Sequence, residues 1–243
     1  MTPVRGLRAM RLLIGALPVA LLAALAVTLR LGAAREVREH GEYVVLFVAL
    51  GAAWLIGLSW ASGWLGVHVQ DDAIERNNAA AAIAASGTLA GGMIVYAGAN
   101  LGEGDTIWKT IGPALQASAL ILALWGMHQV LSDATDAITL DRDVASGIRF
   151  AGMALGTGLV IARAAAGDYV SALDTARDLF VQGWPALPLV ALGVFVQVRL
   201  RPTKEQPKPN AVTRGLIPAF VYLALAVVVL LYLGSFRSTG AGQ

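Results

Sequence analysis

The sequence predicts an all-α, polytopic bundle of about seven transmembrane helices. Apolar residues make up 57% of the chain, charged residues only 14%, and the mean hydropathy is +0.66, which is typical of membrane proteins. Crossing a bilayer takes about 20 mostly apolar residues. Seven segments meet that requirement, at 12–31, 43–67, 77–99, 107–131, 144–166, 179–199 and 215–234. Their connections are short, so the chain has no room for a separate soluble domain.

The first segment, within an N-terminal region of residues 1–42, has two interpretations. It follows Arg5, Arg8 and Arg11, so it is either a retained transmembrane helix or a signal peptide cleaved near Ala34. Its apolar run is long for a signal peptide, and Arg30 lies close to the proposed cleavage site. We therefore expect a retained helix.

The next four segments, within residues 43–166, contain two related copies. At an offset of 65 residues (143 minus 78), Asn78 aligns with Asp143, Gly87 with Gly152, and Gly91 with Gly156. The acidic loops 68–76 and 132–143 lie two crossings apart, so they share one face of the membrane. The pattern predicts a parallel repeat of two-helix units, not the inverted repeat of many transporters.

The last two segments lie within residues 167–243. Pro185 and Pro188 should bend the segment 179–199, because proline cannot donate a helical hydrogen bond. The stretch 200–210 is a basic, proline-rich loop, and 215–234 is an apolar helix expected at the periphery. A modest excess of Lys and Arg, carried mainly by the 199–214 loop, predicts a cytoplasmic N-terminus.

Composition and motifs exclude several functions. The chain has no cysteine, which excludes disulfides, thiolate metal sites and thiol nucleophiles. It carries no phosphate-binding loop, zinc-protease helix or nucleophile elbow, so we expect no enzyme activity, no metal and no cofactor. The net charge of +2 comes from basic loops that set membrane topology, so we expect no nucleic-acid partner.

Small residues recur at helical spacing in both copies. The first copy places Ala80, Ala84, Gly87 and Gly91 on one helix face. At the equivalent positions the second copy has Ala145, Arg149, Gly152 and Gly156. Such faces allow membrane helices to approach closely, so we interpret these residues as helix-packing positions against each other or against other helices.

Polar residues near the cytoplasmic helix ends are the candidate site. The residues expected to contact solute in a polar vestibule are Asn77, Asn78, Asp143, Arg149 and His128. Four of these residues also have a purely structural interpretation. In that interpretation Asn78 and Asp143 cap helix N-termini, Arg149 extends back to the lipid headgroups, and His128 is a buried hydrogen-bonding residue. The nearby acidic loops favour cations over anions.

Residues 76–92 and 141–162 resemble the YjfL-like bacterial inner-membrane family, domain of unknown function 350. The resemblance covers about residues 43–166, and Asp143 departs from the family's asparagine. It implies a bacterial inner-membrane protein without an assigned activity, and some relatives are associated with ligases of the glutathionylspermidine synthase type. The residues that carry it are Asn77, Asn78, Ala80, Ala81, Ser86, Gly87, Thr88, Leu89 and Gly91, then Asp143, Ala145, Gly147 and Gly152.

Two functional hypotheses follow from these observations. The first is a channel or transporter for small cationic solutes with a cytoplasmic-side polar vestibule. The alternative is a non-catalytic membrane scaffold or anchor that docks a cytoplasmic partner enzyme through its charged loops. Under both hypotheses the protein lies in a lipid bilayer, and we expect a homo-oligomer.

Overall fold

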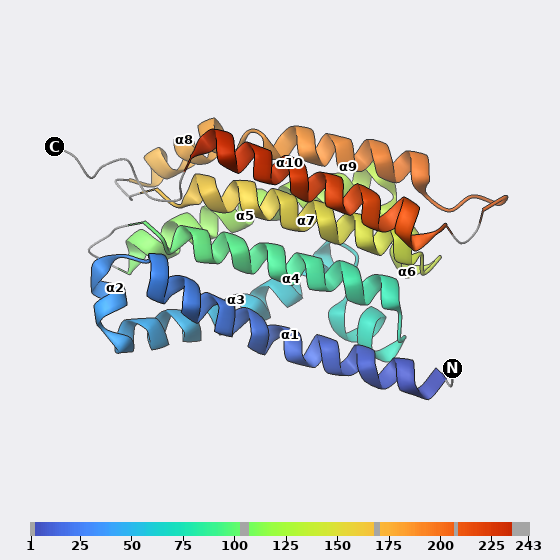
Figure 1. Cartoon of the computed structure of the whole chain (residues 1–243), viewed down its shortest axis with the longest axis horizontal. Coiled ribbons are helices and arrows are strands. Elements are labelled where there is room, and N and C mark those ends of the chain that lie inside the picture. Colours follow the sequence, from blue (N-terminus) through green and yellow to red (C-terminus); the bar gives the residue numbers. More distant parts are fainter. Residues whose placement is uncertain (1–2, 103–106, 168–170, 207–208, 235–243) are drawn as a thin grey trace.

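The computed structural model describes residues 3–102, 107–167, 171–206 and 209–234, and every regular element in these ranges is helical (Figure 1). Two of the elements, η1 and η2, are short π-helical segments. In chain order the elements are α1 Pro3–Gly32, α2 Arg35–Glu39, α3 Gly41–Trp64, η1 Val69–Glu75, α4 Ala79–Ala99, α5 Trp108–Ser132, α6 Ala134–Thr139, α7 Val144–Ala165, α8 Ala172–Gly183, α9 Ala186–Leu200, η2 Val212–Leu216 and α10 Ile217–Leu233.

The chain is a multi-pass membrane protein by helix length and hydropathy. Within the described ranges, six helices are long and apolar enough to cross a bilayer. The bent pair α8 and α9 raises the number to seven if it forms one span. The all-helical fold with about seven spans predicted from the sequence is therefore confirmed at this level.

The span predicted at 179–199 is divided into two helices. α8 ends at Gly183, α9 begins at Ala186, and their axes differ by 52°. Pro185 occupies the N-cap of α9, where its missing N–H costs no helical hydrogen bond. The predicted bend is present, but α8 starts earlier than expected, because Ser171 caps it by accepting a hydrogen bond from the Asp174 N–H at 3.2 Å.

The two acidic loops contain short helical segments. Residues 68–76 form η1, and residues 132–143 contain α6. Asp72 stabilises the start of η1, because its Oδ2 accepts a 2.9 Å hydrogen bond from the His68 N–H. These segments place the N-termini of α4 and α7 at one end of the molecule (Figure 1).

Helices α4 and α7 form the centre of the bundle. They lie side by side and run in the same direction, with α1 and α3 on the α4 side and α9 and α10 on the α7 side (Figure 1). In the most apolar part of α4 and of α7, 72% of the residues are buried. The corresponding fraction is 11% for the span in α1 and 22% for the span formed by η2 and α10. The outer helices therefore carry the surface that faces lipid, and the polar residues of α4 and α7 lie inside protein.

Candidate functional site

The α4–α7 interface brings the backbones of two helices into contact. A Cβ added at Gly91 would lie 2.7 Å from the Ala154 carbonyl oxygen, closer than Cβ atoms approach oxygen in real structures. At Gly87 it would overlap the Ala151 backbone. Backbone atoms cannot move aside as a side-chain tip can, so these positions require glycine. The contact continues along the helices at the pairs Gly147–Ala80, Gly158–Gly91 and Gly98–Ala162.

The two small-residue faces have different neighbours. The face of α4 that carries Gly87 and Gly91 packs on α7. The face of α7 that carries Gly152 and Gly156 packs instead on α10, where a Cβ added at Gly156 would lie 3.1 Å from the Tyr222 carbonyl oxygen. α7 thus presents one small-residue face to α4 and another to α10. The other members of the predicted faces, Ala80, Ala84 and Ala145, are each 0% exposed.

Asn78 and Asp143 cap the two central helices in the same way. The Asn78 Oδ1 accepts hydrogen bonds from the Ala80 and Ala81 N–H groups at 3.0 and 3.3 Å. The Asp143 carboxylate accepts from Ala145 and Ser146 N–H groups at 3.2 and 2.9 Å. Both caps are buried. A buried helix terminus needs such partners for its free N–H groups, so the capping role is met at the start of both α4 and α7.

The backbone leading into each cap also matches at the offset of 65. Asn77 and Arg142, the residues before the caps, have positive φ angles of 52° and 54°. The Asn78 N–H donates to the Asp72 carbonyl at 3.2 Å, and the Asp143 N–H donates to the Ala137 carbonyl at 2.9 Å. Each cap is therefore preceded by the same local turn.

Arg149 is buried at the meeting point of α7, α9 and η2. Its side chain is 2% exposed. Its Nε donates to the Gln197 Oε1 at 2.8 Å, one terminal nitrogen donates to the Arg214 carbonyl, and the other donates to the Ser146 Oγ at 2.8 Å. Protein groups surround the guanidinium, which is buried inside the bundle.

The positive charge of Arg149 is matched by Asp143. The nearest terminal nitrogen lies 3.6 Å from the Asp143 Oδ2. Ser146 connects the two, because its hydroxyl donates to the same Oδ2 at 2.6 Å while the Gln197 Nε2 donates to the Ser146 Oγ at 2.8 Å. We call Asp143, Ser146, Arg149 and Gln197 the Arg149 network. Its charges balance and its hydrogen bonds are satisfied, which is what a buried ion pair requires.

Among the described residues, His128 and Asn77 share no hydrogen bond or ion pair with this network. His128 is 2% exposed, and its ring packs on Phe150 with the ring centroids 5.5 Å apart. Asn77 is half-buried, with its Nδ2 donating to the Glu75 carbonyl at 3.2 Å. The His128 Nδ1 and the Asn77 Oδ1 have no hydrogen-bond partner among the described residues. The structure therefore joins Asp143 to Arg149 but gathers neither His128 nor Asn77 into their site.

Sequence reasoning missed three partners of Arg149. Ser146 and Gln197 supply side chains, and Arg214 supplies a carbonyl. Of these three, Gln197 could have been recognised from the sequence, because it is an amide within the apolar run Val194–Val198. A polar residue in such a run usually faces another polar group inside the bundle.

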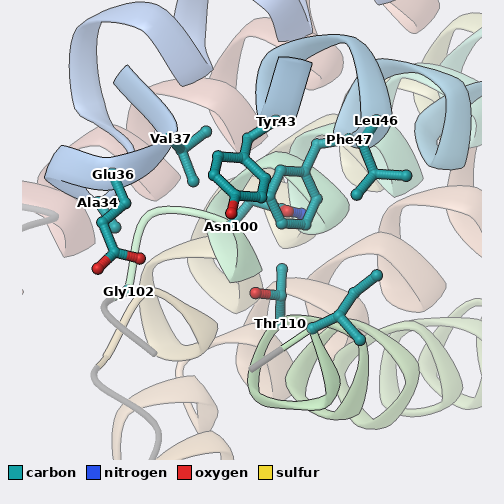
Figure 2. Close-up of a pocket in the computed structure, with 10 residues that line it drawn as sticks. Ala34, Glu36, Val37, Tyr43, Leu46, Phe47, Asn100, Gly102 and Thr110 are labelled. Carbon is teal, nitrogen blue, oxygen red and sulfur yellow. The ribbon is translucent and has the colours of Figure 1, made fainter. Parts of the chain in front are cut away.

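The cavities lined by described residues elsewhere on the molecule include the following three. One of about 120 Å³ lies between α2, α3 and the start of α5, and Figure 2 shows its lining. An apolar one of about 550 Å³ lies between α5, α8 and α9, and a third of about 230 Å³ lies beside Trp60 and Trp64. None of the three is lined by the predicted vestibule residues. Across the described ranges, no cluster of His, Cys, Asp or Glu has the grouping of a metal site.

Comparison with known families identifies a family for the first two thirds of the chain. The model for Domain of Unknown Function (DUF350) matches residues 13–165, from the first span through α7. The match covers more than half of the chain and includes both capped central helices. No curated protein and no solved structure matches the chain. The chain belongs to the DUF350 family, as the resemblance in its two capped helices indicated.

Proposed function

We propose that the protein is a non-catalytic membrane scaffold that docks a soluble partner at the end carrying η1 and α6. The observation that carries this proposal is the closed centre of the bundle. α4 and α7 meet backbone to backbone, and the Arg149 network is satisfied within the protein. A rigid core of this kind holds the surface elements at its end in fixed positions. It therefore favours a scaffold over a channel or transporter.

The docking surface is formed by charged residues that the fold leaves exposed. Asp71 and Glu75 on η1, Asp136 on α6 and Asp141 before α7 are all exposed. Other acids at this end have structural partners, since Asp72 pairs with Arg76 at 2.9 Å and Asp133 with Arg201 at 3.2 Å. The exposed acids therefore suit a partner with a basic surface, which they would attract and orient.

The proposal includes a cytoplasmic location for this end in a bacterial inner membrane. The excess of Lys and Arg around the 199–214 loop supports it, because positive loops stay in the cytoplasm. It also includes a duplicated origin of residues 43–166. The matching caps, positive φ angles and turn hydrogen bonds of Asn78 and Asp143 support that duplication.

Single-cysteine variants provide the test, because the natural chain has no cysteine. We would place one cysteine at Asp71 or Asp141, and a matched one at Glu39, which lies at the opposite end of α3 on the exposed helix α2. A thiol-reactive cross-linker is then applied in native membranes. Discrete adducts with a soluble protein are expected from Asp71 and Asp141 and not from Glu39. Adducts between two copies would report the expected homo-oligomer.

Charge variants complete the test. In the variant with its cysteine at Asp141, Asp71→Asn, Glu75→Gln and Asp136→Asn together should abolish the adduct, while Glu39→Gln should leave it unchanged. An adduct that survives these three substitutions would refute the acidic docking surface.

Transport of small cations is the second candidate, favoured by the polar side chains of Glu36, Tyr43 and Thr110 that line the 120 Å³ cavity at the opposite end. In reconstituted vesicles, transport predicts a cation flux that Arg149→Ala changes. The scaffold proposal predicts no flux for the wild-type protein.

A further inference from the structure

The 550 Å³ cavity lies between α5 and the bent pair of helices α8 and α9, and we call it the α5–α8–α9 groove. The helices that form it touch on both sides of the groove. On one side the Gln116 Nε2 on α5 donates to the Ala172 carbonyl on α8 at 3.2 Å. On the other side α9 approaches α5, because a Cβ added at Gly193 would lie 3.1 Å from the His128 ring. The groove lies between these contacts, at the 52° bend where α8 ends and α9 begins.

The groove has a buried floor and an exposed rim. Leu124 on α5 and Leu179 on α8 line it and are only 6% and 5% exposed. Phe180 and Trp184 line it as well and are 79% and 58% exposed. The groove therefore opens at the outer surface of the bundle, and a molecule reaches the two floor leucines only by entering it.

The groove lies at the depth of the hydrocarbon. Its wall on α5 extends from Gln116 to Leu124, and Leu120 in that wall is twelve residues from Trp108 and twelve from Ser132, the two ends of the helix. At a rise of 1.5 Å per residue, Leu120 lies about 18 Å from either helix end. In a bilayer the rim is therefore bordered by lipid tails and not by water.

The rim suits a flexible chain better than a helix of another protein molecule. Close helix contacts in this bundle use small residues, as at Gly91 and Gly156, because these let two backbones approach. The rim instead carries Phe180, Trp184 and Leu187, whose large side chains keep a second helix away from the floor. Every residue that lines the groove is uncharged, so a charged ligand finds no counter-charge there.

We propose that the α5–α8–α9 groove binds one acyl chain of a membrane phospholipid. The chain enters past the rim and packs on the floor leucines, while the headgroup stays at the bilayer surface. An empty groove would leave its floor without van der Waals partners, and a lipid tail is as apolar as the leucines that it contacts. The lipid around the outer helices is continuous with the rim, so entry requires no transfer through water. The site is independent of the docking surface, because no exposed acid of η1 or α6 lines it.

The test uses a phosphatidylcholine that carries a photoreactive diazirine at the middle of one acyl chain. The full-length protein is placed in lipid nanodiscs that contain this lipid, and after illumination the lipid adducts are located by mass spectrometry of peptides. Adducts are expected on Leu124 and Leu179, which lipid outside the groove does not reach. A lipid with the diazirine at the start of the chain should label these two residues at least several-fold less, because the groove lies at the middle of the span.

A groove-filling variant makes the result specific. Ala176 lines the groove, so Ala176→Phe should reduce the adducts on Leu124 and Leu179 at least several-fold. Ala224→Phe is the matched control, since Ala224 is exposed on α10 and does not line the groove, and it should leave those adducts unchanged. Adducts on Leu231, which is 78% exposed on α10, should be equal in all three proteins and show that each is inserted in the bilayer.

Three results would overturn the proposal. The first is a wild-type protein whose floor leucines stay unlabelled while Leu231 is labelled. The second is labelling of the floor that Ala176→Phe does not diminish. The third is efficient disulfide formation between two copies of a Trp184→Cys variant in the same nanodiscs, because it would show that a second copy covers the groove.

Discussion

Replacing Arg149 by methionine should destabilise the protein by about 3 kcal/mol, because it breaks a buried ion pair. The substitution removes hydrogen bonds to Gln197, to Ser146 and to the Arg214 carbonyl, and it leaves the Asp143 carboxylate without its counter-charge. Breaking such a pair costs about 3–5 kcal/mol. We expect the lower end, since Asp143 keeps the Ala145 and Ser146 N–H groups and the Ser146 hydroxyl.

An exposed ion pair in the same chain is the control. Arg201 lies 3.2 Å from Asp133, and the two side chains are 47% and 69% exposed. Water already solvates these charges, so Arg201→Met should cost only about 0–1 kcal/mol. Both variants would be measured by denaturant titration of the purified protein in mixed micelles, with tryptophan fluorescence as the signal for unfolding.

A double variant isolates the charge interaction. Asp143→Asn keeps an oxygen for the helix cap, as Asn78 does at the start of α4, but leaves the Arg149 charge unbalanced. Combining it with Arg149→Met removes both charges. The loss of stability in this double variant should therefore be smaller than the sum of the two single losses by about 1–3 kcal/mol. Strict additivity, or a cost for Arg149→Met no larger than that for Arg201→Met, would refute the idea that the buried charges depend on each other.

Two further stability predictions use the same titration. Gly87→Ala should destabilise the protein by about 1–3 kcal/mol, because its Cβ meets the α7 backbone, whereas Gly57→Ala, with open space at that Cβ, should change stability by less than about 1 kcal/mol. Equal effects at the two glycines would contradict the close helix contact. Asn78→Ala should cost about 1–3 kcal/mol through the lost cap and the lost 2.7 Å bond to the Ile138 carbonyl. Asn78→Ser should keep a neutral capping oxygen and lose the Nδ2 donor, so an Asn78→Ser variant as unstable as Asn78→Ala would show that the cap contributes little.

The sequence predicted the helical fold, the number of spans and the bend near Pro185 because these depend on local properties. Length, hydropathy and the missing proline N–H act on each segment separately. The capping oxygens of Asn78 and Asp143 could also be predicted, because a helix start needs an acceptor whatever packs around it. Short helices such as η1 and α6 escaped prediction, since hydrophobic periodicity gives little signal over so few residues.

Tertiary structure decided which helix each small-residue face meets and what surrounds the polar groups. Gly91 and Gly156 are equivalent in sequence, yet one packs on α7 and the other on α10, because α7 lies between two neighbours. The sequence indicated that Arg149 points into the bundle, but only the packing of α9 and η2 supplied Gln197 and the Arg214 carbonyl. Those partners come from segments distant along the chain, and no local pattern determines how such segments meet. The same holds for the cavity lined by Glu36 and Asn100, which exists only where α2 and the end of α4 come together.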